Sequence, residues 1–215
     1  MTALRRTIAA LYRDLGTHGL NAGTAGNVSA RTKHGMLITP TGITGADVSP
    51  KALVETALDG TYKGRVAPSS EWAMHAAIFR QAPEARVIVH THSDAATALA
   101  CLNRPLPPFH YAVLAFGGPD VPIAPYETFG TPELAAAAAH AIAGRTACLL
   151  ANHGMICHAP TAPAALRTAL LLEALCRQYL LALSAGTPRL LTETELEAAR
   201  DRNATYGQPT AKETP

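Results

Sequence analysis

The sequence lacks paired cysteines, nucleotide-binding signatures and any long run of like charges. Its four cysteines lie far apart, at positions 101, 148, 157 and 176, and no Cys-x-x-Cys pair occurs. They are therefore interpreted as small buried apolar residues in a reducing compartment. Neither a Walker A segment nor a Gly-x-Gly-x-x-Gly fingerprint is present, so nucleotide binding is not indicated.

Charged residues are sparse, at 16% of the chain, and the net charge is only +2. Because the lysines and arginines are scattered, a dedicated nucleic-acid surface is not expected. Hydrophobic residues make up 48% of the sequence, which is typical of a globular protein. At 215 residues, we expect one domain over 1–215, with 204–215 as a C-terminal tail.

The sequence also lacks a signal peptide and an uninterrupted membrane-spanning segment. Its first segment has apolar residues at helical spacing with Arg5, Arg6 and Asp14 between them, which predicts an amphipathic surface helix. Arg167, Glu173 and the later Arg177 interrupt the apolar stretch 166–183, so a buried amphipathic helix is favoured there. We expect a soluble, cytoplasmic protein that contacts no membrane.

Strand and helix patterns alternate irregularly, which favours a mixed sheet covered by helices. Helices are expected over 3–16, 71–81, 93–102, from 132 onward with Thr131 as N-cap, over 166–183 and over 193–203. Strands are expected near 27–31, 36–39, 52–58, 61–65, 87–89, 111–115, 121–123, 147–151 and 155–158. The turn at Asp59-Gly60 joins two of these strands.

The most informative motif is His90-Thr91-His92, which follows the β-branched run 87–89. Side chains two apart on a strand point to the same face, so the two imidazoles are expected to project together. Paired imidazoles fill a core poorly and hold a metal well. With nine histidines in the chain, however, a chance His-x-His pair is not rare.

Glu71 and His153 are the further candidate ligands. Glu71 lies at the start of a predicted helix, where a carboxylate also simply stabilises the helix dipole. His153 precedes Gly154, and a turn residue is the alternative there. His75 is one helical turn beyond Glu71 and is interpreted as a packing or supporting residue. Four other histidines are assigned to turns or the surface: His18, His34, His140 and His158.

Three short segments are rich in glycine, hydroxyls and amides: 23–27, 39–42 and 68–70. Glycine lets the backbone approach an anion, and hydroxyl groups donate hydrogen bonds to its oxygens. Ser69 and Ser70 open a helix, where free backbone N–H groups favour phosphate. For any one of these segments, ordinary turn and N-cap chemistry is the more common explanation.

Taken in order, these motifs resemble the class II aldolase and epimerase family of bacterial sugar-phosphate enzymes, and most closely its fuculose-phosphate aldolase branch. The matching segments are 20–29, 36–43, 68–72, 90–92, 123–131 and 153–154, so the likeness covers nearly the whole chain. The resemblance implies a three-layer αβα fold with a mixed, largely antiparallel central sheet. It also implies a homotetramer with C4 symmetry and active sites at the subunit interfaces.

The resemblance further implies one divalent metal per subunit, usually zinc, with manganese or cobalt as alternatives. The metal ligands would be Glu71, His90, His92 and His153. The phosphate contacts would be Gly26, Asn27, Thr41, Gly42, Ser69 and Ser70. Glu71 would also move protons in the reaction, and Tyr111 of a neighbouring subunit would act as the catalytic tyrosine.

Departures from the fuculose-phosphate branch concern the aldehyde pocket, which the resemblance assigns to Phe129, Asn203 and Tyr206. That branch has an aromatic residue where Asn203 stands and alanine where Glu127 stands. Phe129 and Tyr206 keep the aromatic pattern. The phosphate and metal half of the site is therefore expected to be retained, while the identity of the aldehyde changes.

The expected function is reversible cleavage of a ketose 1-phosphate to dihydroxyacetone phosphate and an aldehyde. Candidate substrates are fuculose 1-phosphate, 5-deoxyribulose 1-phosphate and methylthioribulose 1-phosphate. Epimerases of the family have aspartate at the Glu71 position, so glutamate favours an aldolase; decarboxylases and dehydratases of the family remain alternatives. An adducin-like, non-enzymatic module lacks the metal ligands and is disfavoured.

Overall fold

The computed structural model describes residues 2–206, and a seven-stranded sheet forms the centre of this part. The strand order is β3-β2-β1-β4-β7-β6-β5, and the neighbours are antiparallel except for the parallel pair β5 and β6. The strands are β1 (Asn27–Thr32), β2 (Gly35–Ile38), β3 (Val54–Thr56), β4 (Val87–Thr91), β5 (Ile123–Ala124), β6 (Ala147–Leu150) and β7 (Gly154–Ala159). The expected mixed, largely antiparallel sheet is confirmed.

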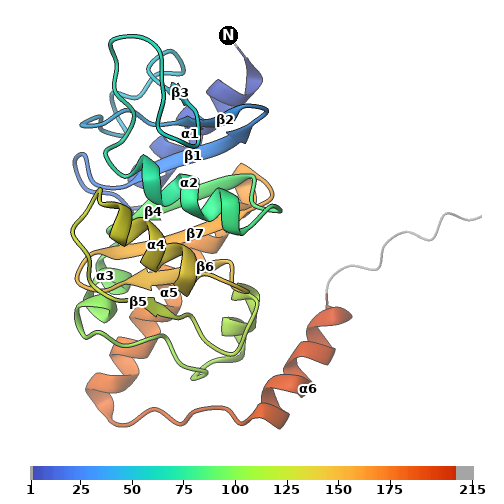
Figure 1. Cartoon of the computed structure of the whole chain (residues 1–215). Helices are drawn as coiled ribbons and strands as arrows, with labels where there is room; N and C mark the ends of the chain where they lie inside the picture. Colours follow the sequence, from blue (N-terminus) through green and yellow to red (C-terminus); the bar gives the residue numbers. More distant parts are fainter. Residues whose placement is uncertain (1, 207–215) are drawn as a thin grey trace, which may run out of the picture.

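Helices cover both faces of this sheet and complete the expected three layers (Figure 1). The helical elements are α1 (Ala3–Thr17), α2 (Trp72–Gln81), α3 (Asp94–Cys101), the 3₁₀ helix η1 (Tyr111–Phe116), α4 (Pro132–Ala141), α5 (Ala162–Ala185) and α6 (Glu193–Ala204). Buried residues of α2 and α4 share one core cluster, and those of α1, α3 and α5 share the other. Figure 1 shows α6 standing away from the layered body.

β4 runs through the middle of the sheet and contributes to both cores. Val87 and Val89 pack into the cluster of α1, α3 and α5, while Ile88 packs into that of α2 and α4. Because both faces are covered, residues 87–89 of the strand are all apolar rather than alternating with polar residues. This central position places the end of β4, with its histidine motif, inside the molecule.

α5 is the one helix of the described residues that is long and apolar enough to cross a membrane by length and composition. Its buried residues, among them Ala165, Leu172 and Cys176, belong to the core cluster beneath the sheet. The prediction of a core helix interrupted by charges, in a soluble protein, therefore fits its packing. Three of the cysteines are buried as expected, but Cys101 at the end of α3 is exposed.

Two predicted strands are wrong or too long in the segment after β2. Only 54–56 of the predicted strand 52–58 is extended, and 61–65 meets it through a single bridge between Thr56 and Tyr62. The predicted turn is present, with the Gly60 N–H bonded to the Ala57 carbonyl. Residues 61–65 are exposed, and Gly64 has φ 104°, so this segment has no apolar face to bury and cannot continue an edge strand.

The predicted strand at 111–115 is also wrong, since this segment forms η1. Val113 and Phe116 are buried, and a spacing of three residues aligns them on one side of a 3₁₀ helix. The ring of His110 caps this helix by accepting the N–H of Ala112. Near 121–123, the strand β5 begins only at Ile123, and Val121 instead bridges Leu106.

The other predicted elements lie within a few residues of those observed, including the helix that Thr131 caps through Leu134 N–H. His158 is an exception among the histidines, because it lies buried on β7 rather than at the surface. α6 reaches Ala204, and residues 207–215 lie outside the described residues. A single domain with a tail over 204–215 therefore stays a prediction.

Candidate metal centre

Three histidines meet where β4 ends and where β6 turns into β7. His90 lies on β4, His92 follows one residue after the strand, and His153 directly precedes β7. Because β4 and β7 are paired, with Thr91 opposite Met155, the two segments bring these rings together. The three ring centroids lie 4.7 to 4.9 Å apart, each pair edge to face.

Gly154 makes this close approach possible. A Cβ added at Gly154 would lie 2.4 Å from the backbone oxygen of Thr91 and 3.1 Å from the ring of His92. Asn152, two residues earlier, has a left-handed backbone with φ 53°, a conformation that asparagine adopts more readily than most residues. The Asn-His-Gly sequence thus serves the tight turn that presents His153.

Glu71 completes the cluster from a distant part of the sequence, immediately before α2. Its Oε2 lies 3.2 Å from His90 Nε2, and its Oε1 lies 3.2 Å from His153 Nε2. His90 Nε2 and His92 Nε2 are 3.0 Å apart. One ligand atom from each of the four residues lies within 4.8 Å of the others.

The donor set fits a divalent metal ion. A tetrahedral zinc site with bonds of about 2.0–2.1 Å has ligand atoms about 3.3 Å apart, close to the observed separations. His90 Nδ1–H donates to the Met155 carbonyl at 2.8 Å, which leaves Nε2 as the nitrogen for a metal. Glu71 Oε1 is buried, and its one close polar neighbour among the described residues is His153 Nε2, itself a candidate ligand, so a cation between them would satisfy both atoms.

The electrostatics of the cluster agree with such a site. Burial opposes ionisation of Glu71, but His90 and His153 outweigh it and hold the pKa of Glu71 well below its usual range. Burial also opposes protonation of His90, yet the Glu71 carboxylate raises the pKa of His90. Burial and the neighbouring His90 and His153 lower the pKa of His92 to about 4. The short Glu71–His90 contact therefore favours the ionised carboxylate and the protonated imidazole, and a bound cation would compete with that proton.

The sequence predicted a packing or supporting role for His75, but it did not predict the chain of hydrogen bonds that lies behind Glu71. Asn27 Nδ2 donates to Glu71 Oε2 at 2.8 Å, and Asn27 Oδ1 lies 2.5 Å from His75 Nε2. The other ring nitrogen of His75, Nδ1, lies 2.7 Å from Ser29 Oγ. All four residues are buried. The available signal was the spacing: 27 and 29 share a strand face, and 71 and 75 share a helix face.

The three glycine- and hydroxyl-rich segments converge beside the cluster. A cavity of ≈ 130 Å³ is lined by Gly26, Asn27, Thr41, Gly42, Ser69, Ser70, Glu71, His92, Phe129, His153 and three neighbouring residues of the same loops, Thr24, Ala25 and Pro40. Gly26 has φ 76°, and a Cβ there would lie 2.7 Å from the His90 carbonyl oxygen. All six residues predicted to contact phosphate therefore lie next to the predicted metal ligands.

The predicted aldehyde-side residues are brought together only in part. Phe129 lines the cavity and is exposed, whereas Tyr111, Asn203 and Tyr206 are absent from the lining of this chain's own cavity. Tyr111 is 52% exposed on η1. Asn203 lies on α6, which contacts η1 and stands apart from the cluster (Figure 1).

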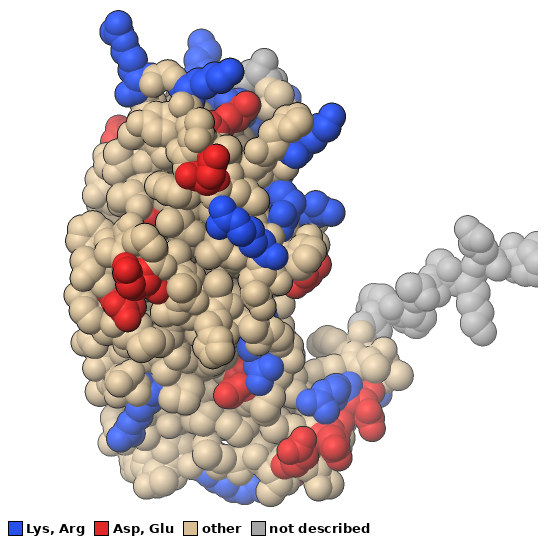
Figure 2. Space-filling view, viewed as in Figure 1, with Lys and Arg blue, Asp and Glu red and all other residues tan. Residues whose placement is uncertain are grey.

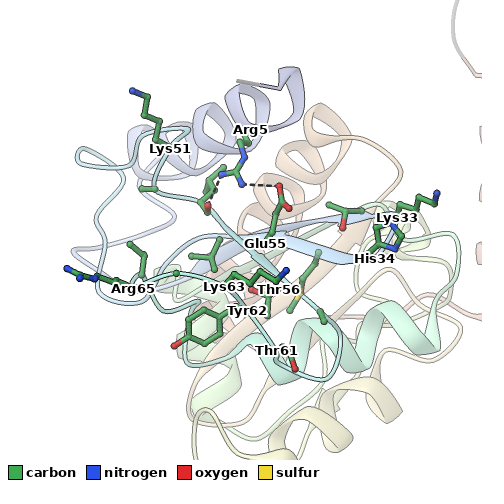
Figure 3. A pocket seen from close by; sticks show the side chains of 18 residues that line it. Arg5, Lys33, His34, Lys51, Glu55, Thr56, Thr61, Tyr62, Lys63 and Arg65 are labelled. Atoms are coloured by element: carbon green, nitrogen blue, oxygen red, sulfur yellow. Dashed lines mark hydrogen bonds and ion pairs between the residues drawn. The ribbon is translucent and has the colours of Figure 1, made fainter.

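A larger hollow of ≈ 730 Å³ lies elsewhere, between α1, the β2–β3 edge and residues 61–66. Its charged side chains are mostly basic, but Arg5 is bound to Glu55 and to the Leu53 carbonyl. Figure 3 shows Lys51, Lys33 and Arg65 extending away from the hollow. Figure 2 likewise shows lysine and arginine gathered at this end of the molecule and acidic residues along α6. The larger hollow is lined by one carboxylate, Glu55, which is already paired with Arg5. The smaller cavity is lined by three of the four clustered ligand residues, Glu71, His92 and His153, so we place the candidate site there.

Comparisons with known proteins identify the family of the chain. Residues 6–180 match the Class II Aldolase and Adducin N-terminal domain family. The chain is 44% identical over 205 residues to a Rhodospirillum rubrum protein named 5-methylthioribulose-1-phosphate/5-deoxyribulose-1-phosphate aldolase, covering 95% of this chain and 93% of that protein. It is 41% identical over 190 residues to the L-fuculose phosphate aldolase of Escherichia coli K12, covering 88% of each.

The fold comparison gives the same result. A solved structure named L-fuculose 1-phosphate aldolase superimposes with a TM-score of 0.90 at 35% identity, covering 95% of this chain and 97% of that one. A second, the L-fuculose-1-phosphate aldolase from Thermus thermophilus, gives a TM-score of 0.75 at 30% identity, covering 87% of this chain and 98% of that one.

Proposed function

Because the chain belongs to the Class II Aldolase and Adducin N-terminal domain family and is a class II aldolase, a carbon–carbon lyase, we propose that it reversibly cleaves a ketose 1-phosphate to dihydroxyacetone phosphate and an aldehyde. The observation that carries this proposal is the four-residue cluster beside the cavity of glycine and hydroxyl loops. The aldolase names of the relatives support cleavage over epimerisation, decarboxylation or dehydration.

We assign the metal site to Glu71, His90, His92 and His153, with one zinc ion per subunit. Three imidazoles and a carboxylate suit zinc, and manganese or cobalt would accept the same ligands. A divalent ion held there would stabilise the negative charge that develops on the substrate oxygens as the carbon–carbon bond breaks. His90 is fixed for this role by its hydrogen bond to the Met155 carbonyl.

Glu71 is the residue we assign to proton transfer at C3 of the ketose. Its pKa is low because His90 and His153 surround the carboxylate. When substrate displaces the carboxylate from the cluster, those contacts weaken and its pKa rises toward the ordinary value, which makes it a better base. The hydrogen bond that Asn27 Nδ2 donates to Glu71 Oε2 would limit how far the carboxylate moves.

The phosphate group is assigned to the loops that line the cavity opposite the histidines. The residues are Gly26, Asn27, Thr41, Gly42, Ser69 and Ser70. Thr41 and Ser70 offer hydroxyl donors, and the glycines allow the backbone to approach the phosphate oxygens. Ser69 Oγ accepts the Glu71 N–H, so its own hydroxyl hydrogen is free to turn to the ligand.

Tyr111 and the α6 residues support a site completed by a second subunit. Tyr111 is exposed and does not line its own cavity. We therefore assign Tyr111 of a neighbour to the proton on the C4 oxygen, in a cytoplasmic homotetramer with interface sites. Light scattering coupled to gel filtration tests the tetramer, and mixing metal-free His92→Ala with Tyr111→Phe subunits tests whether activity returns in hybrids.

The substrate we favour is a short ketose 1-phosphate, of the 5-deoxyribulose or methylthioribulose type. The relative with 44% identity carries those names, while fuculose 1-phosphate is the substrate in the names of others. The test is release of dihydroxyacetone phosphate from these three phosphates and from their unphosphorylated ketoses. Equal turnover with and without phosphate would overturn the phosphate assignment, and no release from any ketose 1-phosphate would overturn the function.

A further inference from the structure

His75 is a fully buried histidine in the core beside the candidate site, although it does not line the cavity. An apolar ring would fill the same space without any need for hydrogen-bond partners. Instead, both ring nitrogens have partners, Ser29 Oγ at 2.7 Å and Asn27 Oδ1 at 2.5 Å. Such complete pairing of a buried imidazole restricts its orientation and that of its partners.

The chain of hydrogen bonds has a single consistent direction. A carboxylate only accepts, so Asn27 presents its amide N–H₂ to Glu71, and its Oδ1 therefore faces His75. His75 must then carry its proton on Nε2, which donates to Oδ1. The remaining nitrogen, Nδ1, accepts the hydroxyl hydrogen of Ser29. Burial and the nearby His90 lower the pKa of His75 to about 3, which agrees with a neutral ring.

The four residues of this hydrogen-bond chain lie on β1 and at the start of α2, so the backbone fixes their relative positions. Asn27 and Ser29 lie two residues apart on β1, and Glu71 and His75 lie four residues apart at the start of α2. Asn27 is also the β1 residue directly opposite His90. The Asn27 amide thus connects His75 to the four predicted metal ligands. Asn27 also lines the cavity, so it connects His75 to the cavity as well.

We propose that His75 is a positioning residue, whose Nε2–H holds the Asn27 amide so that its nitrogen points at Glu71 and into the cavity. The proposal rests on the proposed function, in which Glu71 and Asn27 act on the substrate. Without His75, no N–H group holds the Asn27 oxygen on the side away from Glu71. A flipped amide would direct an oxygen at the Glu71 carboxylate and repel it.

The kinetic test compares His75→Phe, which keeps the ring but removes both nitrogens, with His75→Gln, whose amide can still donate to Asn27. His158→Phe is the matched control, because it removes another buried histidine, whose ring nitrogen Nε2 lies 3.2 Å from the Arg145 carbonyl oxygen. In metal-loaded protein we expect His75→Phe to lower kcat about 10–100-fold with a smaller change in KM. His75→Gln should recover part of the loss, and His158→Phe should keep the wild-type kcat.

A wild-type kcat in His75→Phe, or no recovery in His75→Gln, overturns the proposal. Should His75→Phe fail to fold, Ser29→Ala replaces it, since it removes the hydrogen-bond donor to His75 Nδ1, leaves the ring less firmly oriented and should lower kcat more mildly. A Ser29→Ala enzyme with wild-type kcat would then count against the positioning role.

A spectroscopic test separates this proposal from the proposed function. Histidine-labelled, metal-free protein should show, by ¹H–¹⁵N correlation, a neutral His75 with its proton on Nε2 and a lone pair on Nδ1. Ser29→Ala should keep the proton on Nε2, because Asn27 Oδ1 still accepts it, and should shift the Nδ1 resonance, because that nitrogen loses its hydrogen-bond donor. A proton on Nδ1 in the wild type overturns the positioning role whether or not any ketose phosphate is cleaved.

Discussion

The carboxylate of Glu173 on α5 accepts a hydrogen bond of 2.9 Å from the backbone N–H of Ala95 at the start of α3. Its second oxygen accepts the Ala96 N–H at the same distance. The side chain of Ser93, the N-cap of α3, makes no capping hydrogen bond, so a residue far away in the sequence supplies the cap. Because α3 begins two residues after His92, this contact also fixes the backbone that carries a predicted metal ligand.

Replacing Glu173 by alanine should therefore destabilise the protein. Two backbone N–H groups at the buried start of α3 would lose their acceptor, at a cost of about 1–3 kcal/mol in the free energy of unfolding. Denaturant unfolding measures this cost. Glu197→Ala, at an exposed position on α6, is the control and should change the unfolding free energy little. Equal stability of the two variants would show that the cap is dispensable.

His92→Ala should remove both the metal and the cleavage activity. The variant leaves two histidines and Glu71, and it also opens the cluster to water on the side facing the cavity. Metal content of the purified protein, measured by mass spectrometry, checks the first effect. His140→Ala on α4, where the side chain is exposed, should retain metal and activity. A fully active His92→Ala protein with stoichiometric metal would refute the ligand assignment.

Two glycine substitutions should have opposite effects. Gly154→Ala would place its Cβ 2.4 Å from the Thr91 carbonyl oxygen, so β7 and β4 must separate beside His92 and His153. We expect lower stability and weaker metal binding. Gly16→Ala, in α1 with nothing within 4 Å of its Cβ, should instead stabilise the protein by about 0.5–1 kcal/mol. Thermal unfolding compares them, and a Gly154→Ala protein as stable as the wild type would contradict the close approach.

The four candidate metal ligands could be predicted from the sequence, because each lies in a pattern of a few neighbouring residues. A strand-end His-x-His, a carboxylate at a helix start and a histidine before glycine are each local patterns, and the structure brings these four residues together. The chain through Ser29 and His75 could not be predicted in the same way. Its contacts join residues 46 and 48 positions apart, so they depend on how α2 lies on β1.

The errors in the fold have related causes. Residues 61–65 contain strand-forming types, but strand formation also needs a partner edge and an apolar face, which the sequence pattern does not reveal. In 111–116, buried Val113 and Phe116 are three residues apart, as in a 3₁₀ helix, but the segment is too short for this spacing to be told from the alternation of a strand. Both segments lie at margins of the sheet, where tertiary contacts decide the conformation.

The metal-free protein should be most stable near pH 6.5. The pKa values of His75 and His92, about 3 and about 4, lie below that of an unfolded histidine, about 6.5. As the pH falls below that value, the unfolded chain binds protons that the folded protein does not, so stability decreases. The raised pKa of His90 contributes stability at low pH that is lost as the pH rises through it.

Thermal unfolding between pH 4 and 8 measures this profile. His75→Phe should flatten its acidic side, because one of the two histidines that resist protonation is gone. His34→Phe, at an exposed position, should leave the profile unchanged. A wild-type melting temperature that increases steadily from pH 6.5 to 4 would contradict the expected sign.

The last prediction concerns the aldehyde. Asn203 stands on α6, outside its own chain's cavity, at the position where the sequence resemblance implies an aromatic residue in the fuculose-phosphate branch. If α6 of a neighbouring subunit closes the aldehyde pocket, Asn203→Phe should restore an apolar wall and shift the ratio of kcat/KM values toward fuculose 1-phosphate. An apolar wall contact changes discrimination by about 1–3 kcal/mol, so we expect a shift of roughly ten- to a hundredfold. Asp201→Phe, on the same helix, is the control for adding an aromatic ring. An unchanged ratio in Asn203→Phe, in a wild type that already prefers fuculose 1-phosphate, would show that this position does not set the substrate.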